Sequence, residues 1–563
     1  MFHGRIVHLD LKGAPPKPDY LIHAFIPMLR RFGATGLLIE WEDMFPYLGP
    51  LAEVRSGYAY TPQNVAEILE TAARERIAVV PLVQTFGHLE WLLKHPLFAD
   101  LREAHDFPQV VCPSNARTYD VLFELIDQIV ARHSSSDAIH IGADEVFTVG
   151  ACARCRATIA TRLGDSAEAL ILEHISKVAR YVKDKHGLKV LMWHDMLQNM
   201  ETIIMREYLM DELVEPVIWG YVPQLAASNY FPHDLFERFR QTFPRIWVAS
   251  AYKGANGPDQ SFIAIGRYLD NHLSWIELCA DKFANPRYQG RLEGIILTGW
   301  QRFDHFSVLC ELLPVAIPSL AINLLTVSEG GFSPRAIVPM ARRLLDCRSV
   351  VGTGGAMAGH ASLSPHITGA TIGPNALSRY NGAPGAMNNG IAGTSLGPHV
   401  LGGHASATAL DGPDGLIDPT GSAVASEGLA SLSWMNCDFP GSPIYRGAEE
   451  LRLMRNKVTE MFENPEVVGW LSEYNRIQAY AHPSIAKRWY NMASHLLNDL
   501  ISLGGQLRVE LARLYFDDTV DEWLYQNVQT QLDKLRSFRE TLIPIFQAEE
   551  FPKRPLRRLR LDV

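Results

Sequence analysis

Residues 137–145 read Asp-Ala-Ile-His-Ile-Gly-Ala-Asp-Glu, a short apolar run that ends in two adjacent carboxylates. We predict a β-strand from Ala138 to Glu145. Neighbouring side chains of a strand point to opposite faces, but where the chain turns at the strand end, Asp144 and Glu145 can reach one pocket. Adjacent acids repel unless each has its own environment, and such pairs often supply the acid and base of an active site. A polar strand end with a glycine turn and no catalytic role would have the same sequence pattern. The rest of the chain is needed to choose between the two interpretations.

The composition is that of a large globular protein. The chain has 563 residues, 47% of them hydrophobic, which is enough for two or three domains with a sizeable core. The net charge of -10 argues against a nucleic-acid binder, whose affinity would rest on a basic surface. We find no run of about 18 apolar residues and therefore expect no membrane span. The seven cysteines do not have the spacing of a disulfide framework, so we predict reduced thiols. Because we recognise no signal peptide, we expect a cytoplasmic protein.

Eight apolar runs alternate with segments of helical periodicity along the first 345 residues or so. The predicted strands are 6–11, 36–43, 78–88, 138–145, 189–196, 215–221, 246–254 and 294–300. Near-continuous apolar strands separated by helices indicate parallel strands that are buried on both faces. Eight such units favour a TIM (β/α)8 barrel, because a doubly wound sheet seldom repeats so evenly.

Polar and aromatic residues gather at the predicted carboxyl ends of these strands, where TIM barrels carry their active sites. They are Asp10, Lys12, Glu42, Asp43, His88, Asp144, Glu145, Trp193, Asp195, Trp219, Tyr221, Tyr252 and Trp300. Core packing alone explains such a set poorly. Aromatic faces can stack on the C–H bonds of a sugar ring, and carboxylates can accept hydrogen bonds from its hydroxyls, so we predict a sugar-binding site.

The stretch from His140 to Glu145 matches the His-x-Gly-x-Asp-Glu signature of family 20 glycoside hydrolases, the β-N-acetylhexosaminidases. Phe86-Gly87-His88 resembles that family's Pro-Gly-His, with Phe in place of Pro. Three longer runs, 7–16, 42–47 and 297–305, resemble the nucleocytoplasmic branch of the family. The likeness covers about residues 4–345 and returns at 440–530, and several separate blocks agree in order.

The resemblance implies a retaining exo-enzyme without a protein nucleophile, in which the 2-acetamido oxygen of the substrate attacks the anomeric carbon. Glu145 would be the general acid and later the base. Asp144 would hold the acetamido N–H and stabilise the charge that develops there. His88 would form a hydrogen bond with Glu145, and Glu42 or Asp43 would lie behind His88 and adjust its charge. Asp10, His140 and Asp195 complete the predicted sugar-binding set.

A tyrosine usually donates to the acetamido oxygen in this family, and we rank Tyr252 first and Tyr221 second. Trp193, Trp219 and Trp300 would enclose the sugar and its acetamido methyl. The arginine of the secreted branch has no obvious counterpart here, and Lys12 stands close to its place. Strand eight reads Trp300-Gln301-Arg302 instead of Trp-x-Glu, so Asp304, or else Glu311, would take the 4- and 6-hydroxyls.

Two short motifs remain outside this prediction. Cys152 and Cys155 form a Cys-x-x-Cys, but a zinc site needs about four ligands. Because the sequence shows no second pair, we expect two inert thiols, no metal and no cofactor. The basic tail within residues 551–563 is a candidate nuclear address.

Beyond the barrel, predicted for residues 1–345, the character of the chain changes twice. Residues 350–435 are rich in Gly and Ala and almost uncharged, so we expect a disordered linker. Residues 440–550 carry helical apolar stripes, including one at Leu496, Leu497, Leu500 and Ile501. These helices should pack on the barrel, with a homodimer through the same helices as the second option.

The sequence thus predicts an exo-acting β-N-acetylhexosaminidase that releases terminal N-acetylhexosamine from glycoconjugates, with β-N-acetylgalactosaminides preferred. We expect neither nucleic acid nor a membrane as a partner. One alternative is a catalytically silent sugar-binding or scaffold protein. Another is a two-carboxylate retaining glycosidase with Asp195 or Glu42 as its nucleophile.

Overall fold

The computed structural model describes residues 2–226, 230–288, 290–348 and 434–559. Within these residues, parallel strands close into a barrel in the order β1-β10-β9-β8-β7-β6-β3-β2. Their bounds are β1 Gly4–Asp10, β2 Gly36–Glu40, β3 Ala78–Leu82, β6 Ala138–His140, β7 Lys189–Trp193, β8 Glu215–Trp219, β9 Ile246–Lys253 and β10 Leu292–Gly299. The predicted TIM barrel and its eight strands are confirmed, and each strand ends before the last residue of its predicted range.

Two apolar layers hold the barrel together. Inside it, side chains from alternate positions of the strands form a buried cluster that includes Ile6, Leu38, Val80 and Ile296. The intervening side chains point outward against the surrounding helices, as the two-residue period of a strand requires. The barrel is therefore a filled core, and its carboxyl end is where polar side chains can gather.

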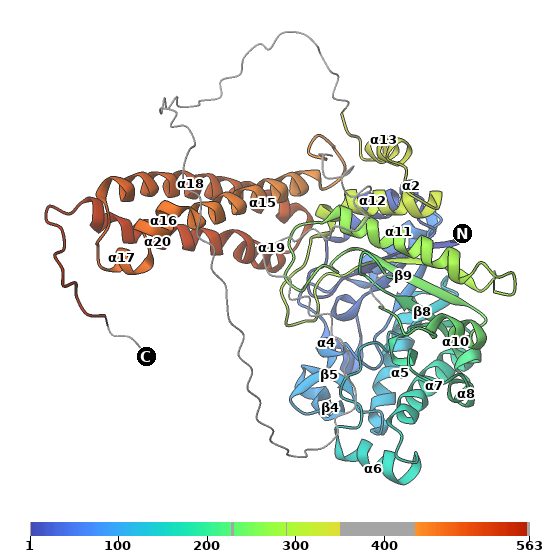
Figure 1. The fold of residues 1–563 in the computed structure, drawn as a ribbon. Coiled ribbons are helices and arrows are strands. Elements are labelled where there is room, and N and C mark those ends of the chain that lie inside the picture. Colours follow the sequence, from blue (N-terminus) through green and yellow to red (C-terminus); the bar gives the residue numbers. More distant parts are fainter. Residues whose placement is uncertain (1, 227–229, 289, 349–433, 560–563) are drawn as a thin grey trace, which may run out of the picture. The chain divides into compact units, whose positions relative to one another are not determined.

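Helices cover the outside of the barrel (Figure 1). The first helical segment runs through α1 Pro18–Tyr20, a π-helical turn at Leu21–Phe25 and α2 Ile26–Phe32. The others in this region are α3 Pro62–Arg74, α4 Glu90–Leu93, α5 Ala116–Arg132, α6 Ala153–Arg162, α7 Ala167–His186, α8 Thr202–Glu207, α9 Met210–Leu213, α10 Leu235–Thr242, α11 Ile265–Lys282, α12 Leu313–Glu329 and α13 Pro334–Leu344. Thr61 caps the start of α3, since its side chain and that of Asn64 each accept a hydrogen bond from the other's backbone N–H.

A small antiparallel hairpin that we did not predict lies between β3 and α5. It consists of β4 Arg102–Ala104 and β5 Phe107–Val111. The hairpin is bonded to the segment that carries His88: Val111 N–H donates to the Phe86 carbonyl at 3.2 Å, and Leu89 N–H to the Gln109 carbonyl at 3.0 Å. It therefore supports one of the loops at the carboxyl end of the barrel.

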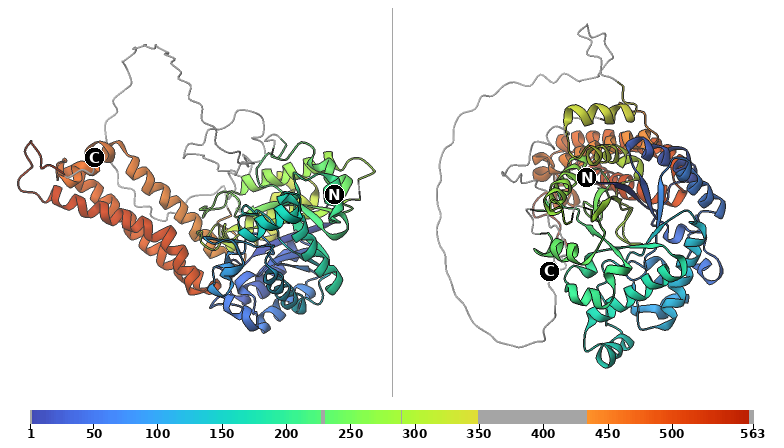
Figure 2. Two further views of the ribbon diagram at one scale, coloured as in Figure 1. Left: turned by 90° about the horizontal axis from the view of Figure 1, so that it is seen from below. Right: turned by 90° about the vertical axis from the view of Figure 1, so that its right-hand side faces the viewer.

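The C-terminal region is helical, as predicted. Its elements are α15 Ser442–Glu463, α16 Pro465–Trp470, α17 Glu473–Ile477, α18 Pro483–Leu514, α19 Asp517–Leu524, a π-helical turn at Tyr525–Gln529 and α20 Thr530–Phe546. Helices α15, α18 and α20 run alongside one another (Figure 2). Leu496, Leu497 and Leu500 are buried, but Ile501 is exposed, because it lies at the edge of that apolar stripe and turns away from the neighbouring helices.

These helices dock on the barrel. Lys17 N–H donates to the Leu514 carbonyl at 2.6 Å, and the Lys17 ammonium to the Ala512 carbonyl at 2.6 Å. Arg302, in the loop after β10, makes a two-pronged ion pair with Glu522 of α19 at 2.9 and 3.0 Å. The predicted docking is confirmed, while a homodimer stays a prediction.

Two predictions concern the connection between barrel and helices. The predicted linker at 350–435 falls almost wholly on residues 349–433, which lie outside the described residues. Cys347 and Cys437 form a disulfide, so the expectation that every cysteine is reduced is wrong for this pair. Their separation of 90 residues gives no local signal, and only the fold brings them together. In the described parts of the chain, none of the helices has the length and apolar character that crossing a membrane requires.

Candidate active site

Asp144 and Glu145 lie in the loop that follows β6 at the carboxyl end of the barrel. Gly142, Ala143 and Glu145 all have positive φ values, of 66°, 65° and 48°. Such backbone costs about 1–3 kcal/mol per non-glycine residue and persists only where the surroundings hold it. This loop therefore turns both carboxylates toward the barrel axis, as the adjacent pair in the sequence predicted. Asp144 is 7% exposed, whereas Glu145 is more open to solvent.

His88 connects the loop after β3 to this pair. Its Nε2 lies 3.1 Å from Glu145 Oε2 and 3.5 Å from Asp144 Oδ2, so the predicted contact between His88 and Glu145 is confirmed. Gly87 makes this approach possible, since a Cβ there would stand 2.3 Å from the carbonyl oxygen of Asp144. The two loops thus touch through their backbones, and a side chain at Gly87 would force them apart.

Burial and charge act in opposite directions on these groups. Burial raises the pKa of Asp144 to about 7, with help from Asp195 and Glu145, although His88 opposes the shift. Burial alone would lower the pKa of His88, but the carboxylates of Asp144, Glu145 and Glu90 outweigh it and raise this pKa to about 10. The neighbouring carboxylates therefore favour the charged form of His88, whereas burial favours the neutral form of Asp144.

Asp195, just after β7, fixes the position of Glu145. Its Oδ2 accepts a hydrogen bond from Glu145 N–H at 2.8 Å, and its Oδ1 accepts one from the Trp219 indole at 3.1 Å. Burial raises the pKa of Asp195 to about 6. Asp195 therefore holds the backbone of Glu145 and the ring of Trp219 in place.

Aromatic rings surround the acids. Trp219 stacks on Tyr221 with centroids 5.3 Å apart, and Trp300 lies 5.9 Å from Trp193 and 6.4 Å from Tyr221. Trp219 and Trp300 are partly exposed, but Trp193 is buried beside His140. Three predicted ring residues therefore offer accessible surface, and Trp193 forms the floor beneath them.

Tyr252, our first choice for the acetamido oxygen, does not reach this space. It is 0% exposed, and its hydroxyl donates to the His8 carbonyl at 3.3 Å. The order of preference is therefore wrong: its strand position was read correctly, but its side chain points into the outer core. Tyr221 lies among the rings instead, and burial raises its pKa, with a smaller contribution from the charge of Asp144. Burial also raises the pKa of Tyr230, which the sequence did not suggest, and the charges of Glu145 and Asp195 add to this shift.

A second group of charged side chains lies at the ends of β1 and β2. The Lys12 ammonium stands 3.8 Å from both Asp10 Oδ2 and Glu42 Oε1, and 5.7 Å from the centre of the Trp300 ring. Asp10 also accepts bonds from Lys12 N–H and from Gln301 N–H at 2.8 Å. Asp10 thus joins β1 to the loop after β10.

The prediction that Glu42 or Asp43 stands behind His88 is wrong. Glu42 Oε2 lies 2.6 Å from His305 Nε2. Burial raises the pKa of Glu42 and lowers that of His305 to about 2, so the site disfavours the charged form of both groups. Burial also raises the pKa of Asp43 to about 6. Besides Asp144 and Glu145, the acid whose charge acts on His88 is Glu90, the first residue of α4.

The remaining predicted residues have local partners. His140 Nδ1 accepts a bond from Gly142 N–H at 3.0 Å, so it supports the catalytic loop. Asp304 Oδ1 accepts from Phe306 N–H and Ser307 N–H at 2.8 and 2.9 Å and thereby shapes a turn at the rim. Glu311 is buried, where it binds Gly254 N–H and the Tyr268 hydroxyl. Of the two candidates for the 4- and 6-hydroxyls, Asp304 is partly exposed and Glu311 is fully buried.

Sequence reasoning missed His305, Glu90, Tyr230 and Glu40. Glu40 precedes Glu42 by two residues, and on a strand that spacing puts both on the same face; it lies 3.1 Å from His8. That spacing was the available signal for Glu40. His305 and Glu90 follow Trp300 and His88 closely in the chain, but only the turns of their loops bring them inward.

The comparisons with known proteins agree with this geometry. The model of the family described as "Glycosyl hydrolase family 20, catalytic domain" matches residues 25–220. Human hexosaminidase D is 34% identical over 565 residues, which is 100% of this chain and 99% of the human one. Bovine hexosaminidase D is 43% identical over 331 residues, 58% of this chain and 93% of the bovine one.

Among solved structures, a chitobiase from Flavobacterium johnsoniae aligns with a TM-score of 0.46 and 16% identity over 61% of this chain and 50% of its own. The relation to the human protein, by contrast, extends over the full length of both chains. It confirms the resemblance to hexosaminidase D. The chain belongs to glycosyl hydrolase family 20, and within that family it groups with hexosaminidase D.

Proposed function

We propose that this β-N-acetylhexosaminidase releases terminal β-linked N-acetylhexosamine by substrate-assisted catalysis with retention of configuration. The supporting observation is the state of the Asp144 carboxylate. Asp144 is buried beside Glu145, yet its Oδ1 has no hydrogen-bond partner among the described residues. A buried polar oxygen without a partner costs about 1–3 kcal/mol. The N–H of an acetamido group bound at this place would supply the missing donor.

In the first step, the acetamido oxygen attacks the anomeric carbon while the bond to the leaving oxygen breaks. Glu145 gives its proton to that oxygen, and positive charge develops on the acetamido group. Asp144 accepts the N–H and stabilises this charge; in a buried site such stabilisation is stronger than in water. In the second step, Glu145 takes a proton from water, and the water oxygen attacks the same carbon from the side that the aglycone has left. The bond between that carbon and the acetamido oxygen breaks at the same time, which restores the neutral acetamido group.

The other residues position these two. The bond from Glu145 N–H to Asp195 and the contact with His88 hold the Glu145 carboxyl from two sides. Trp219 and Trp300 offer ring faces to the sugar, and the Tyr221 hydroxyl would donate to the acetamido oxygen. Lys12 would bind hydroxyls of the sugar together with Asp10 and Glu42. Positioning of this kind supplies a large part of the rate of many enzymes.

We further propose a preference for β-N-acetylgalactosaminides and a cytoplasmic and nuclear location. Both proposals rest on the likeness to hexosaminidase D. A homodimer through the C-terminal helices remains a proposal as well. Fluorescence imaging of the tagged chain and its mass in solution test the location and the dimer.

Hydrolysis of nitrophenyl β-glycosides tests the chemistry. The substrates are the N-acetylgalactosaminide, the N-acetylglucosaminide and the plain galactoside, each with the wild type, Asp144→Ala and the isosteric Asp144→Asn. We expect activity on the two acetamido sugars alone and its loss in both variants. Cleavage of the plain galactoside that survives Asp144→Ala would favour the two-carboxylate alternative. If none of the substrates is cleaved, the sugar-binding alternative takes its place.

A further inference from the structure

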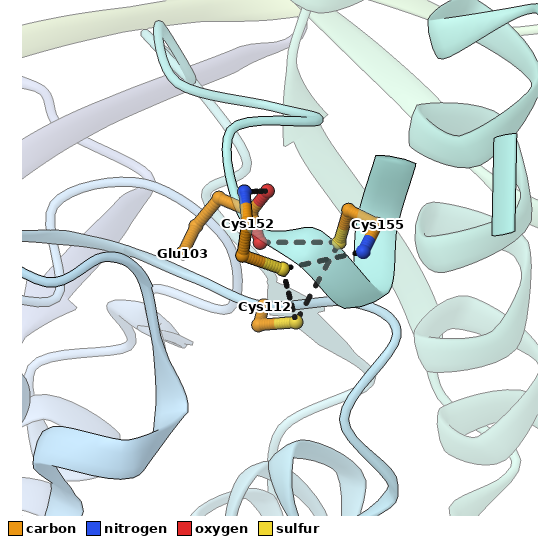
Figure 3. Close-up of side chains that lie close together, drawn as sticks. All are labelled: Glu103, Cys112, Cys152 and Cys155. Atoms are coloured by element: carbon orange, nitrogen blue, oxygen red, sulfur yellow. Dashed lines mark hydrogen bonds between the residues drawn. The ribbon is translucent and has the colours of Figure 1, made fainter. Parts of the chain in front are cut away.

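Three cysteines and one glutamate converge at the start of α6 (Figure 3). Glu103 lies on β4, Cys112 follows β5, and Cys152 and Cys155 belong to the cap and first turn of α6. The two cysteines of the Cys-x-x-Cys motif therefore do meet a second pair of ligands. Glu103 and Cys112 are nine residues apart, and Cys112 lies 40 residues before Cys152. The spacing of these residues in the sequence therefore did not indicate the cluster.

The four side chains offer one ligand atom each, and all four atoms lie within 4.8 Å of one another. Cys112 Sγ is 3.4 Å from Cys152 Sγ and 3.5 Å from Cys155 Sγ. Cys155 Sγ is 3.1 Å from Glu103 Oε2. Sulfur atoms on a tetrahedral zinc ion are about 3.8 Å apart, given Zn–S bonds of about 2.3 Å. Shifts of a few tenths of an ångström would bring the set to that geometry, whereas a disulfide would require contacts of about 2.05 Å.

The surroundings suit bound thiolates better than free side chains. Glu103 is 2% exposed, and among the described residues it accepts hydrogen bonds from the Cys152 N–H at 3.0 Å and from the Cys155 thiol at 3.1 Å. It has no ion pair with a basic side chain there, and a buried charge is normally paired or bound to a metal. Cys155 N–H donates to Cys152 Sγ at 3.2 Å, and the positive end of α6 stabilises thiolates.

We propose that Glu103, Cys112, Cys152 and Cys155 bind one zinc ion that fastens the catalytic loops to each other. Thiolates select zinc over magnesium or calcium, and four convergent ligands make the closed tetrahedral set of a structural site. Cys152 and Cys155 end the loop that carries Asp144 and Glu145. Glu103 and Cys112 belong to the hairpin whose β5 is bonded to Phe86 and Leu89, on either side of His88. Zinc would thus hold the contact between His88 and Glu145 from outside the sugar site.

Metal analysis of the full-length chain tests this proposal directly. The chain is expressed with added zinc, purified without chelators and measured by mass spectrometry of the elements. We expect about one zinc per chain in the wild type, and a loss of at least about 10-fold in zinc affinity for Cys112→Ser and Cys155→Ser. Cys279→Ser is the matched control, because Cys279 is a buried free thiol of α11 outside the cluster, and it should keep the full zinc content.

Cobalt provides a readout that needs neither a variant nor activity. Replacement of zinc by Co²⁺ in the wild type should give thiolate-to-metal charge-transfer absorption and strong tetrahedral visible bands. A zinc content near zero, with no Co²⁺ spectrum on titration, overturns the proposal. So does an intact mass under non-reducing conditions that shows a disulfide within the cluster, or a metal content equal in wild type and Cys112→Ser.

Discussion

Replacing Asp195 by alanine tests how the loop of Glu145 is held. Asp195 accepts bonds from Glu145 N–H at 2.8 Å and from the Trp219 indole at 3.1 Å. Bonds to a charged group contribute about 1.5–3 kcal/mol each, and Glu145 has a φ of 48°, which costs about 1–3 kcal/mol unless it is held. Without the carboxylate, the bond that opposes this strain is gone, so the loop should relax and the Glu145 carboxyl should move.

A displacement of about 1 Å lowers turnover about 100-fold, so we expect kcat of Asp195→Ala to fall by about that factor. The loss of stability should be smaller than the two bonds suggest, because burial of Asp195 is itself unfavourable and raises its pKa to about 6. The assay is kcat and KM on nitrophenyl N-acetylhexosaminides, with urea unfolding in parallel. Asp127→Ala, at a surface acid that bonds Tyr181 and Lys185, is the control. A kcat for Asp195→Ala within about threefold of wild type would refute the reasoning.

Three further predictions follow from named contacts. Tyr221→Phe should lower kcat about 100-fold on acetamido substrates, whereas Tyr252→Phe should leave kcat nearly unchanged; equal losses would contradict the new order of the two tyrosines. His88 has its pKa raised from 6.5 to about 10, so the stability that it provides is complete below pH 6.5 and is lost as the pH rises toward 10. Thermal melts should accordingly fall more steeply over that window in wild type than in His88→Gln, and parallel curves would count against the shift. A double-mutant cycle on Arg302 and Glu522 should give a coupling of about 1 kcal/mol in unfolding, and a value of zero would show that this ion pair does not hold α19 to the barrel.

The sequence alone predicted the barrel and the catalytic pair because both are local properties. The eight strands follow from apolar runs of a few residues that alternate with helical periodicity. Asp144 and Glu145 are neighbours at the end of one such run, and His88 ends another. In a closed parallel barrel the carboxyl ends of all strands meet at one edge. Strand positions alone were therefore enough to place these three residues at the same end of the barrel, whereas the contact of His88 with Glu145 was expected from the family resemblance.

Contacts between loops could not be predicted in this way. Two such contacts join segments that are tens to hundreds of residues apart: Glu42 with His305, and Cys112 with Cys155. The inward direction of Tyr221 and the outward direction of Tyr252 could not be predicted either. Each of these features depends on the path of a loop after its strand and on the residues that pack behind that loop. Neither the path nor the packing produces a periodic pattern in the sequence. The sequence determined which side chains stand at the active end of the barrel, whereas only the tertiary structure decided which of them touch, because side-chain contacts form only after the barrel has closed and its loops have packed against one another.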